Sequence, residues 1–284
     1  MAFLSETPQD YLETPALISS RGTLSYRMLS GAAEKVARQL VTLGVEPGDT
    51  VTVKGHQTVE VVTALHGIWL AGGIAAPLNP RWTAREEERA LMLLRPRLNL
   101  VDTGLPGPPE MKMPADTLTL GPGDGEGVRS LGSHWPDTGP LDHGSASDRG
   151  DEPAVRLFTS GTAGTPSVVT LTCGNLFASA RGARDRLSLH PSDRWLASLS
   201  LAHIGGLAMM TRAALVGSAL VLAGRFRAES LRKLVLEGTV THASLVPTML
   251  GQFLSILGDE SVPRTLRCLL IGGAHAHGDL IRRA

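Results

Sequence analysis

Apolar residues in the first third of the chain alternate between helical and strand spacing. After Ser25, a residue type that caps helices, apolar side chains recur every three or four positions up to Gly44, which indicates a helix with one buried face. Two further helices are expected, one over 59–70 and one that begins at the capping pair Thr83 and Glu86. Short apolar runs between these helices predict strands at 50–53, 74–78 and 98–101.

The same alternation returns in the second half of the chain. Apolar runs predict strands at 155–158, 195–199, 219–222, 243–245 and 266–271. Segments between them predict helices at 175–187, 207–216, 228–237 and 248–257. Strands that are separated by helices of this size form mostly parallel sheets covered by helices. We therefore expect an α/β fold built of layered α/β subdomains.

The segment 103–150 differs from both of its flanks. It contains 10 glycines and 7 prolines among 48 residues, a composition that has little to bury and loses much entropy on ordering. A loose surface connection is expected there, and a mobile lid is the weaker interpretation. The expected organisation is a first α/β subdomain over 1–102, a Gly/Pro-rich connection over 103–150, and a second α/β subdomain over 151–284.

Charge and composition exclude several classes of function. Lys and Arg total 27, as do Asp and Glu, so no basic field exists to attract nucleic acid or an anionic membrane. The most apolar stretch, 199–222, is interrupted by His203 and Arg212, which favours buried core over a membrane span. The two cysteines, Cys173 and Cys268, fit a reducing compartment, and no secretory signal is evident, so a cytoplasmic location is expected.

A strand-to-loop junction at 155–165 carries the chemistry of a phosphate site. Gly161 and Gly164 let the backbone approach an anion, and successive N–H groups can then point into one concavity. Hydroxyl groups surround them on Thr159, Ser160, Thr162 and Thr165. The loop is neither a Walker A motif nor a dinucleotide-binding G-x-G-x-x-G motif. On composition alone, a plain Ser/Thr/Gly turn is an equally good interpretation.

This loop resembles the phosphate loop of the adenylate-forming superfamily, which includes acyl- and aryl-CoA ligases, luciferases and peptide-synthetase adenylation domains. The usual form is T-S-G-T-T-G-x-P-K-G-V, and the chain matches it from Thr159 to Gly164 with one change, Ala163, and again at Pro166. Ser167 stands where the superfamily has a lysine, and Val168 where it has a glycine. The lost lysine contact to ATP is typically worth about 1.5–3 kcal/mol.

A second resemblance lies in segment 193–207, which is similar to the superfamily motif that usually ends in L-P-L-F-H-x-x-G. Ser200 and Ala202 replace the usual proline and phenylalanine. The resemblance implies that His203 lies beside the acyl-substrate pocket and takes part in catalysis. Taken singly, a histidine at a strand end is more often a satisfied structural residue. Its position one motif after the phosphate loop favours the functional role.

Two further segments complete the resemblance. Segment 244–250 matches the superfamily's V-P-T-M-L, which implies that the wall of the acid pocket includes Val246, Pro247 and Thr248. Segment 269–274 resembles the loop that stacks under adenine, which implies contacts from Gly272, Gly273 and Ala274. A helix start and a plain turn are the simpler interpretations of these two segments. Within the superfamily, the chain is most similar to the o-succinylbenzoate–CoA ligases of menaquinone biosynthesis.

The resemblance implies an AMP-forming acid–CoA ligase with the large N-terminal α/β domain of adenylate-forming enzymes. In that reaction a carboxylate attacks the α-phosphate of Mg2+–ATP, and the thiol of CoA then displaces AMP. ATP, Mg2+ and CoA are the expected cofactors, a small carboxylic acid is the expected substrate, and a homodimer is one expected assembly. Since no protein nucleophile is needed, catalysis would rest on positioning and charge stabilisation.

Several parts of the superfamily's machinery are not found in the 284 residues. There is no Y-G-x-T-E motif, and the ribose-binding aspartate and the small C-terminal domain with its lysine are missing, so we expect a truncated chain with little ligase activity alone. The alternative is a degenerate, non-catalytic homologue that binds a nucleotide or a partner, as Ser167 and Val168 suggest. His275 and His277 lack further ligands at zinc spacing, so no metal site is predicted.

Overall fold

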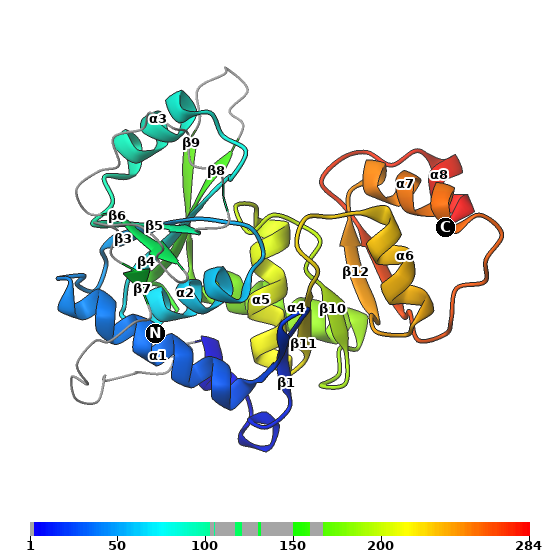
Figure 1. Ribbon diagram of the computed structural model, residues 1–284, viewed down its shortest axis with the longest axis horizontal. Coiled ribbons are helices and arrows are strands. Elements are labelled where there is room, and N and C mark those ends of the chain that lie inside the picture. Colours follow the sequence, from blue (N-terminus) through cyan, green and yellow to red (C-terminus); the bar gives the residue numbers. More distant parts are fainter. Residues whose placement is uncertain (1–2, 103–104, 106–116, 121–129, 132–149, 160–166) are drawn as a thin grey trace.

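The computed structural model describes residues 3–102, 105, 117–120, 130–131, 150–159 and 167–284. Their strands form two sheets, and α5, Ile204–Val216, lies between the elements of the two sheets near the middle of the molecule (Figure 1). Neighbouring strands are parallel in both sheets apart from one antiparallel pair in each. The expected α/β fold with mostly parallel sheets is therefore confirmed.

The first sheet has seven strands in the order β7-β6-β5-β3-β4-β8-β9. Its antiparallel pair is β8 with β9, at one edge. The strand bounds are β3 Thr50–Lys54, β4 Ile74–Leu78, β5 Leu98–Asp102, β6 Thr117–Leu120, β7 Ser130–Leu131, β8 Pro153–Thr159 and β9 Ser167–Thr172. The helices that accompany it are α1 Tyr26–Thr42, α2 Val59–Leu70 and α3 Ala84–Leu94.

The second sheet has six strands in the order β13-β12-β10-β11-β1-β2, so β13 and β2 are its edges. The strand bounds are β1 Pro15–Ser19, β2 Gly22–Ser25, β10 Arg194–Leu196, β11 Ala219–Leu222, β12 His242–Leu245 and β13 Cys268–Ile271. The remaining helices are α4 Cys173–Leu187, α6 Ala228–Leu236, α7 Pro247–Leu257 and α8 Gly278–Arg283, with short 3-10 turns at Phe3–Glu6 and Gln9–Tyr11.

Alternate residues of the second sheet belong to two hydrophobic clusters. Trp195 and Leu220 pack in the large cluster that includes α2, α4 and α5 and reaches the first sheet. Leu196 and Val221 pack in a smaller cluster with α6 and α7. This alternation is the period-two pattern of a strand with two covered faces. The second sheet therefore sits between two layers of helices, as the sequence pattern indicates.

Each sheet combines strands from distant parts of the sequence. β1 pairs in parallel with β11, more than 200 residues later, and so carries β2 into the second sheet. β8 pairs with β4, and so carries β9 into the first sheet. The predicted division into 1–102 and 151–284 therefore does not coincide with the sheets. The connection over 103–150 also contributes β6, which pairs with β5, so it is not loose throughout.

Local sequence signals explain where the helices begin. The Thr83 hydroxyl accepts from the Glu86 backbone N–H, and the Glu86 carboxylate accepts from the Thr83 backbone N–H, which confirms the expected capping box of α3. Ser25 caps α1 by accepting from the Met28 backbone N–H. The apolar stretch 199–222 forms α5 and β11, with Leu207 and Met209 almost fully buried. Within the described residues, no helix has the length and apolar character needed to cross a bilayer.

A buried histidine in α2 makes stability depend on pH. His66 is 3% exposed, its Nδ1 has no hydrogen-bond partner among the described residues, and burial lowers its pKa from 6.5 to about 3. The folded state therefore holds the neutral imidazole, while the unfolded chain takes up a proton below pH 6.5. The free energy of unfolding is therefore unaffected by this group above pH 6.5, and it decreases as the pH falls from 6.5 toward 3 because the unfolded chain alone binds the proton.

We expect acidification from pH 6 to pH 4 to lower the free energy of unfolding by about 1.4 kcal/mol per pH unit through this group alone. In His66→Leu the slope should be smaller by that amount, because no proton can bind at this position in either state. Urea denaturation at a series of pH values measures the difference. Equal slopes for the two proteins would show that His66 does not carry this pH dependence.

Candidate functional site

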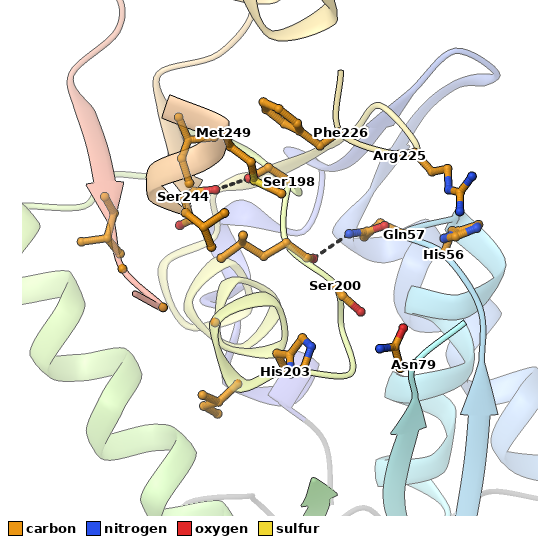
Figure 2. Close-up of a pocket in the computed structure, with 18 of the residues that line it drawn as sticks. His56, Gln57, Asn79, Ser198, Ser200, His203, Arg225, Phe226, Ser244 and Met249 are labelled. Carbon is orange, nitrogen blue, oxygen red and sulfur yellow. Dashed lines mark hydrogen bonds between the residues drawn. The ribbon is translucent and has the colours of Figure 1, made fainter. Parts of the chain in front are cut away.

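A cavity of about 590 Å3 lies at the end of the sheets where the parallel strands finish (Figure 2). One wall carries His56 and Gln57 after β3, and Asn79 and Arg81 after β4. The opposite wall comes from the segments at the ends of β10, β11, β12 and β13. Carboxyl ends of parallel strands are the usual place for ligand sites in α/β folds. This cavity is therefore the candidate functional site.

The segment from β10 to α5 brings His203 to the cavity. Its side chain is exposed and makes no capping hydrogen bond, although His203 stands at the N-cap of α5. Its backbone carbonyl accepts from the N–H groups of Gly206 and Leu207, both at 3.0 Å, which starts the helix. Figure 2 shows Ser200 and Asn79 near the same end of the cavity. His203 is therefore fixed by its backbone and free to meet a ligand with its imidazole.

Gly206 is required by the tight packing of this segment. A Cβ at this position would overlap the backbone carbonyl oxygen of Ser200. The first turn of α5 therefore lies directly against the loop that precedes it, and a larger residue would push Ser200 and His203 away. Glycine serves here for close backbone approach rather than for an unusual φ angle.

The floor of the cavity is a buried polar layer on the second sheet. Ser244 on β12 receives a hydrogen bond from the indole N–H of Trp195 at 3.0 Å. The Ser198 hydroxyl donates to the backbone carbonyl of Ser244. All three residues are almost fully buried, and Ser198 and Ser244 line the cavity (Figure 2). These bonds fix the register between the loop after β10 and the end of β12.

The charged side chains of the lining are basic. Arg81, Arg212 and Arg225 line the cavity, and the described part of its lining contains no Asp or Glu. Figure 2 shows His56 and Arg225 side by side at one end. Burial lowers the pKa of His56, and nearby Arg225 lowers that pKa further, against an opposing effect of Asp102 and with a smaller contribution from Arg81. This end of the cavity is therefore suited to an anion and carries His56 as a neutral imidazole at pH 7.

Arg212, on α5, is a half-buried cation without a carboxylate partner among the described residues. Its guanidinium carbon lies 5.5 Å from the centroid of the Trp195 ring, and its buried Nε finds no hydrogen-bond partner in the part of the chain that the structure describes. Burial lowers the pKa of Arg212, yet an arginine stays protonated near neutral pH. A buried charge of this kind is costly unless an anion pairs with it. A negatively charged group in the cavity would offset this cost.

The structure brings several of the predicted site residues together. The cavity lining includes His203, Val246, Gly272 and Gly273. Pro247 and Thr248 start α7 next to Val246, and Ala274 follows Gly273, but none of these three is part of the lining. Thr159 ends β8, and its hydroxyl lies 3.4 Å from that of Ser167 on β9. The other predicted phosphate-loop residues, Ser160, Gly161, Thr162, Ala163, Gly164 and Thr165, lie outside the described residues.

Sequence reasoning missed Arg212, Arg225, His56 and Gln57 as cavity residues. The sequence did contain a signal for Arg212, because a lone arginine in the apolar stretch 199–222 is unusual in a buried segment and indicates a partner or a function. The other three follow strands closely, but nothing local distinguishes them from surface residues. Their role depends on which strand ends meet in space.

Parallel sheets, a cation-lined cavity at their carboxyl ends and glycines beside that cavity are features of α/β proteins that bind nucleotides and other anions. The chain matches the family model of the AMP-binding enzymes over residues 4–284, and it belongs to that family.

Individual relatives agree with this family. The 2-succinylbenzoate–CoA ligase of Geobacillus kaustophilus is 31% identical over 269 residues, which make up 95% of this chain and 52% of that protein. The o-succinylbenzoate CoA synthetase of Bacillus subtilis in complex with the acyl-adenylate intermediate OSB-AMP has a TM-score of 0.87 and 28% identity, over 99% of this chain and 55% of the other.

The same Bacillus subtilis enzyme in complex with ATP and magnesium ion has a TM-score of 0.84 and 27% identity, over 99% of this chain and 56% of the other. The chain therefore spans about half the length of the curated relatives it matches.

Replacing Gly206 with Ala tests the packing that fixes His203. We expect Gly206→Ala to lower the free energy of unfolding by about 1–3 kcal/mol, because the added Cβ has no room beside the Ser200 carbonyl. The matched control is Gly182→Ala in α4, where a Cβ would meet nothing within 4 Å. That change should stabilise the protein by up to about 1 kcal/mol through helix propensity. Chemical denaturation measures both, and equal effects would contradict the packing argument.

Proposed function

We propose that the protein forms the ATP- and acid-binding part of an AMP-forming acid–CoA ligase, and that its acid is 2-succinylbenzoate. The observation that carries the proposal is the cavity in which His203, Gly272 and the unpaired Arg212 come together. In the proposed reaction a carboxylate oxygen attacks the α-phosphorus of ATP and pyrophosphate leaves. The sulfur of CoA then attacks the acyl carbon and AMP leaves. Relatives of this chain carry the corresponding name.

The shape and charge of the cavity support an aromatic acid with two carboxylates. Apolar side chains that suit a flat ring line the wall on the second-sheet side: Ile204, Phe226, Leu245 and Met249. One carboxylate of 2-succinylbenzoate is activated, and the other keeps its charge throughout. Arg212, a half-buried cation in the cavity lining, would pair with that second carboxylate. Pairing would relieve the cost of burying the guanidinium.

The proposal keeps the roles that the family resemblance implies. The loop of Thr159, Ser160, Gly161, Thr162, Ala163, Gly164 and Thr165 would hold the phosphates of ATP. Gly272, Gly273 and Ala274 would lie against the adenine, and open space at Gly272 where a Cβ would stand leaves its backbone accessible to a flat ring. Val246, Pro247 and Thr248 would border the acid. His203 would touch the reacting carboxylate from the start of α5.

We propose that Mg2+ binds together with ATP. The described residues contain no cluster of three side chains that could hold a metal ion, and none of those that line the cavity is a carboxylate, so no protein ligand is assigned to Mg2+. CoA is proposed as the acyl acceptor without assigned contacts. We propose a cytoplasmic location, because ATP and CoA are available there. A homodimer stays a prediction.

A non-catalytic module that binds a nucleotide or a partner is the second candidate function. The observation that favours it is Ser167, which is exposed on β9 at the position where the superfamily has a lysine. A serine hydroxyl cannot supply the positive charge that a lysine brings to the ATP phosphates. Such a module would bind ATP but would not couple it to an acid.

Titration calorimetry and product analysis separate the two candidates. For the ligase part we expect saturable binding of both ATP and 2-succinylbenzoate to the 284-residue chain. We expect the 284-residue chain alone to form little or no AMP from ATP, Mg2+ and the acid, and chromatography of the nucleotides measures this. Binding of ATP without binding of the acid would favour the module. Binding of neither compound would overturn the ligase part and also a module that binds a nucleotide.

The role of Arg212 makes a sharper prediction. Arg212→Met should weaken binding of 2-succinylbenzoate about tenfold to a hundredfold, because a charge-assisted hydrogen bond contributes about 1.5–3 kcal/mol. The acid 4-oxo-4-phenylbutanoate lacks the ring carboxylate, so it should bind the variant and the unmodified protein equally well. Calorimetry with both acids gives the comparison.

The matched control is Arg232→Met, which removes an arginine that pairs with Glu260 outside the cavity. It should leave both affinities unchanged. A similar loss for the two acids in Arg212→Met would contradict the assignment, because it would mean that Arg212 supports the cavity without pairing with the second carboxylate.

A further inference from the structure

We propose that Gln57 is a positioning residue of the acid pocket: its side-chain amide holds the loop that carries Ser200 and His203 against the first sheet. The inference rests on the proposed function for the identity of the ligand, while the contact itself is independent of that function. Neither the sequence motifs nor the family resemblance points to Gln57.

The contact joins the two walls of the cavity directly. The Gln57 Nε2 donates to the backbone carbonyl of Leu199 at 2.6 Å, across 142 positions of the chain, and Figure 2 shows this bond spanning the walls. Gln57 is only 7% exposed, which is unusual for a glutamine. A buried amide that reaches a distant backbone carbonyl is there for that hydrogen bond.

The Gln57 end of the contact is rigid. Thr58, the next residue, caps α2 by accepting from the Val61 N–H at 3.3 Å, and its hydroxyl donates to the Asp102 carboxylate at 3.3 Å. A Cβ at Gly55 would overlap the side chain of Val61, so the loop after β3 packs tightly onto α2. The Gln57 amide therefore projects from a fixed base on the first sheet.

The Leu199 end lies between two further anchors. Ser198, just before it, is bound through its hydroxyl to the Ser244 carbonyl on β12. Ser200, just after it, lies against Gly206 at the start of α5, and its carbonyl accepts from the His203 N–H at 3.1 Å. Leu199 itself is half-buried in the cavity lining. A shift of its carbonyl would therefore move the residues that meet the ligand.

The hydrogen bond sets the separation of the two walls near His203. Without the amide, the Leu199 carbonyl would lose a buried partner, and water or a rotated peptide would have to replace it. The first sheet would then no longer hold the loop directly through this residue. Gln57 thus acts through Ser200 and His203, and we assign it no contact with the reacting atoms.

Hydrogen exchange measured by mass spectrometry tests the contact without a ligand. In Gln57→Met, which keeps the length of the side chain but removes the donor, amides in 197–206 should exchange about tenfold faster, the effect of about 1.4 kcal/mol of lost local stability. Exchange in β12 and α7 should stay the same. The matched control is Gln39→Met, another buried glutamine, located in α1, which should leave 197–206 unchanged.

Calorimetry with 2-succinylbenzoate provides the second readout. Gln57→Met should weaken acid binding by about tenfold, whereas Gln39→Met should leave it unchanged. Gln57→Asn, which is one methylene shorter, should resemble Gln57→Met because its amide does not reach Leu199.

Unchanged exchange at 197–206, or an equal rise throughout the protein, would overturn the positioning role. Faster exchange at 197–206 with undiminished acid affinity would overturn it as well, because the loop would then not govern the pocket. If the unmodified protein binds no acid, the proposed function fails, and the exchange data still decide whether Gln57 holds this loop.

Discussion

The rest of the structure depends on one constraint: each sheet is built from strands that lie far apart in the sequence. β1 and β2 complete the second sheet from the N-terminal side, and β8 and β9 extend the first sheet from the middle of the chain. Neither sheet can be assembled from one contiguous half. The large hydrophobic cluster runs through both sheets for the same reason. The geometry of the cavity depends on this arrangement, since its walls are formed at the strand ends of both sheets.

Much of the local structure could be predicted, because local sequence determines it. Helix starts follow from caps such as Thr83 with Glu86, and buried strands such as β11 follow from short apolar runs. β9 was not predicted, because its side chains are largely exposed and lack a strand pattern. β6 was not predicted either, since it lies among glycines and prolines and becomes a strand by pairing with β5 and β7. Strand order is set by contacts between distant residues, which local pattern does not record.

Some residues of the candidate site could likewise be predicted from the sequence, and others could not. His203 and Gly272 stand in motifs that sequence comparison can identify, and both line the cavity. Arg212 and Gln57 act through partners far away in the chain or on another element, Trp195 and the Leu199 carbonyl. Among the described lining residues, the absence of Asp and Glu is likewise a property of the folded cavity, because the chain as a whole has equal numbers of acidic and basic residues. The basic character of the cavity thus arises from placement rather than composition.

β13 has a consequence for how the protein behaves in concentrated solution. Within the described residues it forms an edge of the second sheet, and its side chains, Cys268 to Ile271, are half-exposed and uncharged. It borders a groove of about 910 Å3 with further apolar side chains from α7. Edge strands without charge, proline or a bulge offer peptide groups to another chain, and a net charge of zero provides little repulsion. We therefore expect self-association to involve this edge, and a single lysine on β13 to oppose it.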